Sequence, residues 1–168
     1  MQTATPGRKL LKRIRFLLIF FMVAILVSGI TAFPLETELH WLLQYQQYMP
    51  APLGAFIASV YNALHYTNLH YPMLAYGYDW LAFAHIVIAL FFIGPLRDPI
   101  KNIWVIEWGM LACVAVIPLA FIAGAVRGIP FYWKCIDCSF GIFGLIPLYF
   151  LRRWIKELQA MKAPATST

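Results

Sequence analysis

Four long apolar stretches constrain the fold of this chain more than any other feature of its sequence. They run over about residues 15–33, 73–94, 100–126 and 130–151. A helix rises about 1.5 Å per residue, so roughly 20 apolar residues cross the hydrocarbon layer of a bilayer, which is about 30 Å thick. The sequence therefore predicts an all-α integral membrane protein. We expect a four-transmembrane-helix bundle that forms a single domain over residues 1–162, followed by a loose tail at 163–168.

The composition supports a membrane location. Apolar residues make up 62% of the chain and charged residues only 12%, whereas about 25% of the residues in a soluble domain are charged. The net charge is +6, but the basic residues gather at the chain ends and in one loop, which a membrane explains better than nucleic acid does. The expected partners are the lipid bilayer and other membrane subunits, and we expect no nucleic acid.

The basic residues also predict the orientation of the spans. Eleven of the 13 lysines and arginines lie before residue 16, between residues 97 and 101, or after residue 151, and four spans place these segments on one side. Only Arg127 and Lys134 lie on the other side. Because basic residues are retained in the cytoplasm, we expect both termini to be cytoplasmic, in the inner (plasma) membrane of a bacterium.

The first apolar stretch has an alternative interpretation. Its basic head, apolar run and small residues also fit a cleaved signal peptide. The run from Phe16 to Phe33 has 18 residues, whereas the apolar core of such signals has roughly 7–15, and this length favours a span.

Prolines mark the expected beginnings of the last two spans. Asp98 followed by Pro99 is typical of an N-cap with proline at the first helical position, so the third span is predicted to begin there. Pro130 is predicted to open the fourth span in the same way.

Residues 34–72 are predicted to form an outer cap. Apolar residues recur at helical spacing between residues 53 and 64, so they share one face of an amphipathic helix. Such a helix is about 18 Å long and too short to cross, so we expect it to lie along the outer interface among tyrosines of an aromatic belt. Two roles stay open: a lid that seals the bundle, or a lid over a site entered from the outer side.

Four charged side chains mark a polar layer beneath the outer surface. Counting about 1.5 Å per residue from each cytoplasmic boundary places Asp79 and Asp137 at the same height. Lys134 precedes Asp137 by one turn, and Arg127 lies near the beginning of the same span. We interpret these residues either as a binding site for a metal, an anion or a proton, or as acids that pair with a base or cap a helix. In the second interpretation, Asp79 caps a second span that begins late.

Histidines are the other candidate ligands. His40, His65 and His70 in the cap are the only imidazoles able to join a metal at the two aspartates, and their spacing matches no ligand motif. His85 lies near the midplane on a face with small alanines, which let another helix or a flat cofactor approach closely. It is predicted either to bind a haem, for which no other span offers a second histidine, or to hydrogen-bond across the bundle. The identity of any metal or cofactor stays unknown.

Two features of the last two spans concern packing. Gly141 and Gly144 belong to a short stripe of small residues that is suited to close helix contact. Glu107 is expected low on the cytoplasmic side, where an unpaired charge is costly. We expect it to pair with one basic residue there: Lys101, Arg15 or Arg152.

Cys135 and Cys138 form a CxxC pair at the outer end of the fourth span. The pair is close enough to bridge, and a helix N-terminus beside Lys134 lowers thiol pKa values. This run resembles the active pair of the vitamin K epoxide reductase and disulfide-bond oxidase families. That resemblance implies thiol oxidation by Cys135 and Cys138 beside a quinone. Those families use a second, loop-borne cysteine pair, which is missing here, and Cys113 is expected about two turns too deep to replace it.

A second resemblance covers roughly residues 71–153. Three segments carry it: Ala75–Trp80, Gly94–Pro99 and Ile136–Gly141. Together they are similar to a small bacterial inner-membrane family that has four spans and no assigned activity. The resemblance implies the span count and supplies no chemistry.

These observations leave three hypotheses for function. The leading one is a non-enzymatic accessory protein or small binding bundle with a polar layer beneath an outer lid. The alternative is a membrane thiol/quinone oxidoreductase that uses the CxxC pair, and the second alternative is a haem- or metal-binding membrane protein. Whether the chain is an enzyme stays open at this stage.

Overall fold

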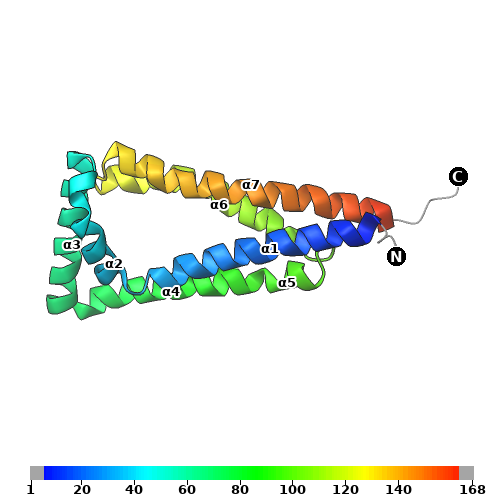
Figure 1. The fold of residues 1–168 in the computed structure, drawn as a ribbon, viewed down its shortest axis with the longest axis horizontal. Helices are drawn as coiled ribbons and strands as arrows, with labels where there is room; N and C mark the ends of the chain where they lie inside the picture. The colour runs from blue at the N-terminus through cyan, green and yellow to red at the C-terminus, as the bar shows by residue number, and fades with distance from the viewer. Residues whose placement is uncertain (1–5, 163–168) are drawn as a thin grey trace, which may run out of the picture. The chain divides into compact units, whose positions relative to one another are not determined.

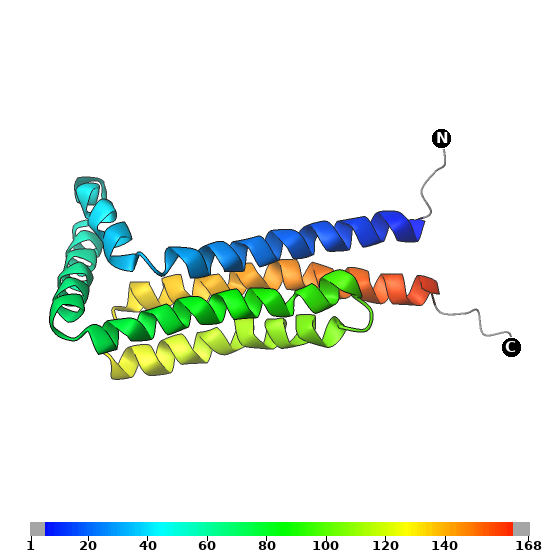
Figure 2. The same ribbon diagram turned by 90° about the horizontal axis from the view of Figure 1, so that it is seen from below.

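The computed structural model describes residues 6–162, so the predicted tail at 163–168 lies outside the described residues. Within 6–162 the chain forms helices and no strands (Figures 1 and 2). In chain order the helices are α1 (Pro6–Thr31), α2 (Leu35–Gln44), the short 3-10 helix η1 (Gln46–Tyr48), α3 (Ala51–His70), α4 (Pro72–Phe91), α5 (Ile93–Arg97), α6 (Ile103–Val126) and α7 (Phe131–Lys162). The predicted all-α class is confirmed.

Four helical segments are long and apolar enough to cross a membrane. They are Pro6–Thr31, Pro72–Arg97, Ile103–Val126 and Phe131–Lys162. The prediction of four membrane-length helices is therefore confirmed.

The last helix is longer than the sequence pattern predicted. α7 continues past Arg152 and Arg153 to Lys162. The reason is that Leu151, Ile155 and Leu158 are spaced on one helical face and are buried. The two arginines therefore mark a change in polarity along α7, and the helix itself continues.

The chain divides into two compact units, which are described separately. Residues 23–90 form one unit, here called the cap unit: the second part of α1, then α2, η1, α3 and α4 up to residue 90. The first part of α1, up to Met22, forms the other unit together with the chain from Phe91 onwards, and we call it the bundle unit.

In the bundle unit, α6 and α7 lie side by side and run antiparallel (Figures 1 and 2). Glycines permit this approach, because a Cβ on Gly141 would stand 2.4 Å from the carbonyl oxygen of Cys113. A Cβ on Gly144 would likewise stand 2.9 Å from the Cys113 Sγ. The predicted use of these two small residues for close packing is confirmed.

An ion pair between α6 and α7 also agrees with the sequence prediction. The Arg152 Nε donates a hydrogen bond to Glu107 Oε1 over 2.8 Å. Of the three predicted basic partners, Arg152 is therefore the one that pairs with Glu107.

The predicted cap of the third span is wrong. Asp98 Oδ1 accepts the backbone N–H groups of Ile100 and Lys101, at 3.2 and 3.1 Å, so it closes a turn before the helix. α6 begins four residues later than Pro99, at Ile103. An aspartate side chain accepts hydrogen bonds from nearby backbone N–H groups in a turn as readily as at the beginning of a helix. The Asp98-Pro99 dipeptide alone therefore does not distinguish a turn from a helix N-cap. Pro130 does directly precede α7, as predicted.

In the cap unit, α2 and α3 pack side by side and are joined through η1 (Figure 1). A helix over residues 53–64 is confirmed, and it extends over the 20 residues of α3. Ile57 and Leu64 on its predicted apolar face are buried. The sequence reasoning missed α2, because ten residues with no side-chain cap give only a weak helical pattern.

Within the same unit, α1 contacts α4 closely at Gly29. A Cβ on Gly29 would lie 2.8 Å from the Cβ of His85 and 2.9 Å from the carbonyl oxygen of Ala82. Ala82 is fully buried. The small-residue face predicted around His85 is therefore occupied by another helix.

Candidate functional site

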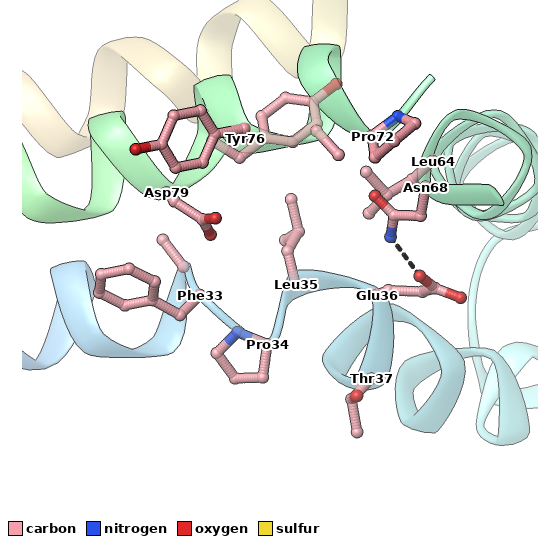
Figure 3. A pocket seen from close by; sticks show the side chains of 13 residues that line it. Phe33, Pro34, Leu35, Glu36, Thr37, Leu64, Asn68, Pro72, Tyr76 and Asp79 are labelled. Atoms are coloured by element: carbon pink, nitrogen blue, oxygen red, sulfur yellow. Dashed lines mark hydrogen bonds between the residues drawn. The ribbon is translucent and has the colours of Figure 1, made fainter. Parts of the chain in front are cut away.

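A polar pocket of about 500 Å³ lies beyond this helix contact, in the cap unit (Figure 3). Its walls come from the turn after α1, the beginning of α2, the second half of α3 and the beginning of α4. Its polar lining residues are Glu36, Thr37, Asn68, Tyr76, Tyr78 and Asp79. The pocket brings together a predicted site residue, Asp79, with polar groups that the sequence reasoning did not select.

The pocket forms because α1 ends at Thr31, two residues after its contact with α4 at Gly29. Proline lacks a backbone N–H and cannot continue a helix, and Pro34 has non-helical backbone angles, φ −85° and ψ 36°. The chain therefore turns into α2, while Phe33 and Leu35 project from the turn beneath α4 (Figure 3). The small residues that bring α1 and α4 together are followed by bulky side chains around an open space.

Asp79 is the carboxylate that faces this space. Its side chain points from α4 toward the turn between α1 and α2 (Figure 3), and the residue is half-buried. Across residues 6–162, the Asp79 side chain makes no hydrogen bond or ion pair. The interpretation that Asp79 caps a late-starting helix is wrong, because α4 already begins at Pro72 and Asp79 lies two turns inside it.

Glu36 is the second carboxylate of the pocket, and it is firmly bound. His65 Nδ1 donates a hydrogen bond to Glu36 Oε1 over 2.5 Å, and the Asn68 amide donates to Glu36 Oε2. A carboxylate only accepts, so the Nδ1 of His65 carries the proton. These hydrogen bonds, with that from His65 the stronger, hold the pKa of Glu36 below its ordinary value.

Sequence reasoning missed Glu36 because its partners are distant in the chain. His65 and Asn68 lie 29 and 32 residues away. Only the shared helical face of His65 and Asn68, three residues apart, offered a signal. The pairing needs the α2–α3 hairpin to be known first.

The cap histidines do not assemble into a metal site. Within the described chain, no three His, Cys, Asp or Glu side chains converge to hold a metal ion. His65 is bound to Glu36, and His70 Nδ1 lies 2.9 Å from the carbonyl oxygen of Tyr66. The ring of His40 lies 5.8 Å from that of Tyr61. These residues therefore belong to the internal contacts of the cap.

Among the described residues His85 makes no hydrogen bond to another helix, contrary to one of its two predicted roles. Its Nδ1 donates to the carbonyl oxygen of Leu81 over 2.8 Å, four residues earlier on the same helix, and the residue is exposed. The carbonyl one turn back is the nearest acceptor on a helix, and it satisfies the ring locally. This geometry identifies no second axial ligand for a haem at His85, and haem binding stays a hypothesis.

The remaining charged residues of the predicted layer belong to the bundle unit. Asp137 and Arg127 line a separate cavity of about 290 Å³ beside Gly124. Asp137 forms no ion pair with Lys134 in the part of the chain that the structure describes. The stem of Lys134 instead lies over Gly124, where a Cβ would stand 2.8 Å from the Lys134 Cδ. A shared level for Asp79 and Asp137 stays a prediction, because the two lie in different units.

The three cysteines are free thiols. Cys135 is exposed and Cys138 is buried, although both lie in the second turn of α7. Cys113 contacts α7 at Gly144, two turns beyond Cys138. The redox hypothesis for Cys135 and Cys138 therefore stays a hypothesis.

Comparison with models of known families, with curated proteins and with solved structures finds no match for this chain. The class that the fold defines is an all-helical protein with four membrane-length helices.

Proposed function

We propose that this chain is a multi-pass protein of the bacterial inner membrane that works as a non-enzymatic binding protein. Its binding site is the pocket lined by Glu36 and Asp79, and the cap helices α2 and α3 form its outer wall. The carboxylate of Asp79, which is half-buried, faces a cavity of about 500 Å³ and has no partner among residues 6–162, carries the proposal. Such a group is costly to leave uncompensated near a membrane, so a ligand is the natural partner.

The proposed orientation follows from the basic residues. Four spans leave the loop from residue 32 to residue 71 on the side opposite both termini, and eleven of the 13 basic residues lie on the side of the termini. A Cβ added to Gly7 at the beginning of α1 would also stand 3.8 Å from the Cδ1 of Leu158 near the end of α7, so these two helix ends lie together, as two cytoplasmic ends would. In this orientation the pocket opens to the outer side.

Binding suits this pocket better than catalysis. A general acid or base works best with a pKa near the operating pH, whereas the hydrogen bonds from His65 and Asn68 keep Glu36 ionised. Asp79 has no base or nucleophile bonded to it within the described residues. We therefore assign the site to recognition, and an accessory role beside other membrane subunits agrees with this assignment.

Labelling of a cysteine placed in the pocket tests the proposal. Ala75 lines the pocket, and Ala75→Cys is introduced into a chain in which Cys113, Cys135 and Cys138 are serine. A membrane-impermeant maleimide added to intact cells is expected to label this variant.

Two matched positions serve as controls in the same background. Val114→Cys, in the middle of α6, is expected to resist the reagent, and Gln159→Cys, near the end of α7, is expected to react only after permeabilisation. Labelling of Ala75→Cys only in permeabilised cells contradicts the proposed orientation. No labelling of it under either condition contradicts a water-filled pocket.

A further inference from the structure

A second, apolar recess adjoins the polar pocket. Its volume is about 300 Å³, and it is lined by Phe33, Tyr76, Asp79, Trp80 and Phe83. Three of these residues, Phe33, Tyr76 and Asp79, also line the larger pocket. Asp79 therefore stands at the junction of a polar compartment and an aromatic one.

The aromatic side chains of the recess hold one another in edge-to-face contacts. The ring centroids of Tyr76 and Trp80 are 5.9 Å apart with an angle of 81° between the rings. Those of Trp80 and Phe83 are 6.2 Å apart with an angle of 90°. The electron-rich face of an aromatic ring attracts a cation, and Trp is the strongest in this respect. The recess thus offers both apolar surface and a favourable environment for positive charge.

The charges of the larger pocket have one sign. Glu36 and Asp79 are its ionisable lining residues apart from two tyrosines, and none of its lining side chains in the described chain is basic. An anionic ligand would meet like charge here, and like charges at close range repel strongly in a partly desolvated site. A cation would gain the Asp79 carboxylate, which has no other partner in the part of the chain that the structure describes.

We infer that the two compartments together bind an organic ammonium ion that carries an apolar substituent. The ammonium group lies against the Asp79 carboxylate at the junction, and the substituent lies in the recess beside Trp80. This inference rests on the proposed binding function and names the ligand class for that site. An inorganic ion such as calcium is a poorer fit, since it needs six to eight oxygen ligands, and no such cluster lies among residues 6–162.

Three probes of similar size separate charge from shape. Phenethylammonium, 2-phenylethanol and phenylacetate carry the same ring with a positive, neutral or negative end. Each is titrated calorimetrically into the full chain in a neutral detergent, and titrations into empty micelles are subtracted. We expect phenethylammonium to bind at least about tenfold more tightly than the other two, as a charge-assisted contact requires.

Matched variants assign the binding to the junction. Asp79→Asn is expected to weaken phenethylammonium binding by about tenfold or more, whereas Asp137→Asn, which changes an acid in a different cavity, leaves it within about twofold. Trp80→Leu provides a second variant that is independent of charge and is expected to weaken binding. Its control is Trp104→Leu, which replaces another exposed tryptophan on a spanning helix that lies outside the recess, and which is expected to leave binding unchanged.

Lipid competitors distinguish two sources of the ammonium group. Competition by phosphatidylethanolamine identifies a lipid headgroup as the ligand, and its failure to compete identifies a free amine. Both results agree with ammonium recognition. Competition by phosphatidylglycerol alone contradicts it, because that headgroup is anionic.

Other results overturn the inference. If 2-phenylethanol or phenylacetate binds as tightly as phenethylammonium, and Asp79→Asn has no effect, the site binds ligands of another class and the proposed binding function stands. If none of the three probes binds, the ammonium inference fails. The labelling of Ala75→Cys then decides separately whether the proposed pocket exists.

Discussion

Gly29 of α1 approaches His85 of α4 so closely that a Cβ on the glycine would lie 2.8 Å from the Cβ of the histidine. This contact sets where the two helices meet, and the pocket begins one turn further along both of them. Glycine at this position is therefore expected to be required for the pocket, although Gly29 does not line it.

Gly29→Ala is expected to destabilise the protein by about 1–3 kcal/mol, the usual cost of adding a methyl group to a packed interface. The carbonyl oxygen of Ala82, 2.9 Å from the added atom, belongs to a helix backbone and cannot move alone. Thermal unfolding in detergent measures the effect. The matched control is Gly77→Ala, a helical glycine on α4, where nothing in the described part of the chain lies within 4 Å of an added Cβ. Equal melting temperatures for the two variants would show that the contact is looser than described.

The hydrogen bonds of Glu36 predict a pH dependence of the cap. Because the pKa of Glu36 is lowered in the folded chain, its contribution to stability is present in full above the ordinary value of 4.5. It is lost as the pH falls through the lowered pKa. The difference in melting temperature between the wild type and Glu36→Gln is therefore expected to be constant at neutral pH and to shrink in acid.

Glu38→Gln is the control for this pH dependence, because Glu38 lies on the same helix and, within residues 6–162, makes no hydrogen bond to His65 or Asn68. The difference in melting temperature between the wild type and Glu38→Gln is not expected to shrink in acid. A Glu36→Gln difference that is the same at every pH would mean that the ionised carboxylate does not hold α3.

Replacing the cysteine pair tests the binding function against the redox alternative. The double variant Cys135→Ser and Cys138→Ser is expected to bind phenethylammonium within about twofold of the wild type, since neither thiol lines the pocket. The redox alternative predicts instead that the two thiols give up two electrons and two protons to a quinone, forming a disulfide and a quinol. Quinol formation by the wild type that is lost in the double variant would support that alternative.

Local properties of the sequence accounted for most of the fold. Span length and the close packing at the glycines at 141 and 144 follow from hydropathy and from one or two turns of helix. The sequence limited the partner of Glu107 to three basic residues, and the packing of α6 against α7 selects Arg152, which lies 45 residues away. The pocket was only half predicted. Asp79 could be selected as a charge within an apolar helix, but Glu36 could not, because it is ordered by residues 29 and 32 positions away.

The wrong predictions have a common physical cause. Each assigned a polar side chain to the partner that its spacing allowed, although another partner was nearer or the helix began elsewhere. Lys134 lies over Gly124 and, in the described chain, forms no ion pair with Asp137. His85 donates its hydrogen bond to the carbonyl oxygen of Leu81. Asp98 closes a turn. Spacing limits which contacts are possible, and packing selects among them.

The electrostatic potential inside the pocket tests the central claim most directly. The measurement is the rate at which Ala75→Cys reacts, in intact cells, with a cationic and with an anionic methanethiosulfonate reagent, each divided by its rate with a free thiol. An outward-facing site for ammonium ions predicts a cation-to-anion ratio of about ten or more, which Asp79→Asn brings near one and Asp137→Asn leaves unchanged. A ratio near one in the parent variant, or no reaction with either reagent, would contradict the account.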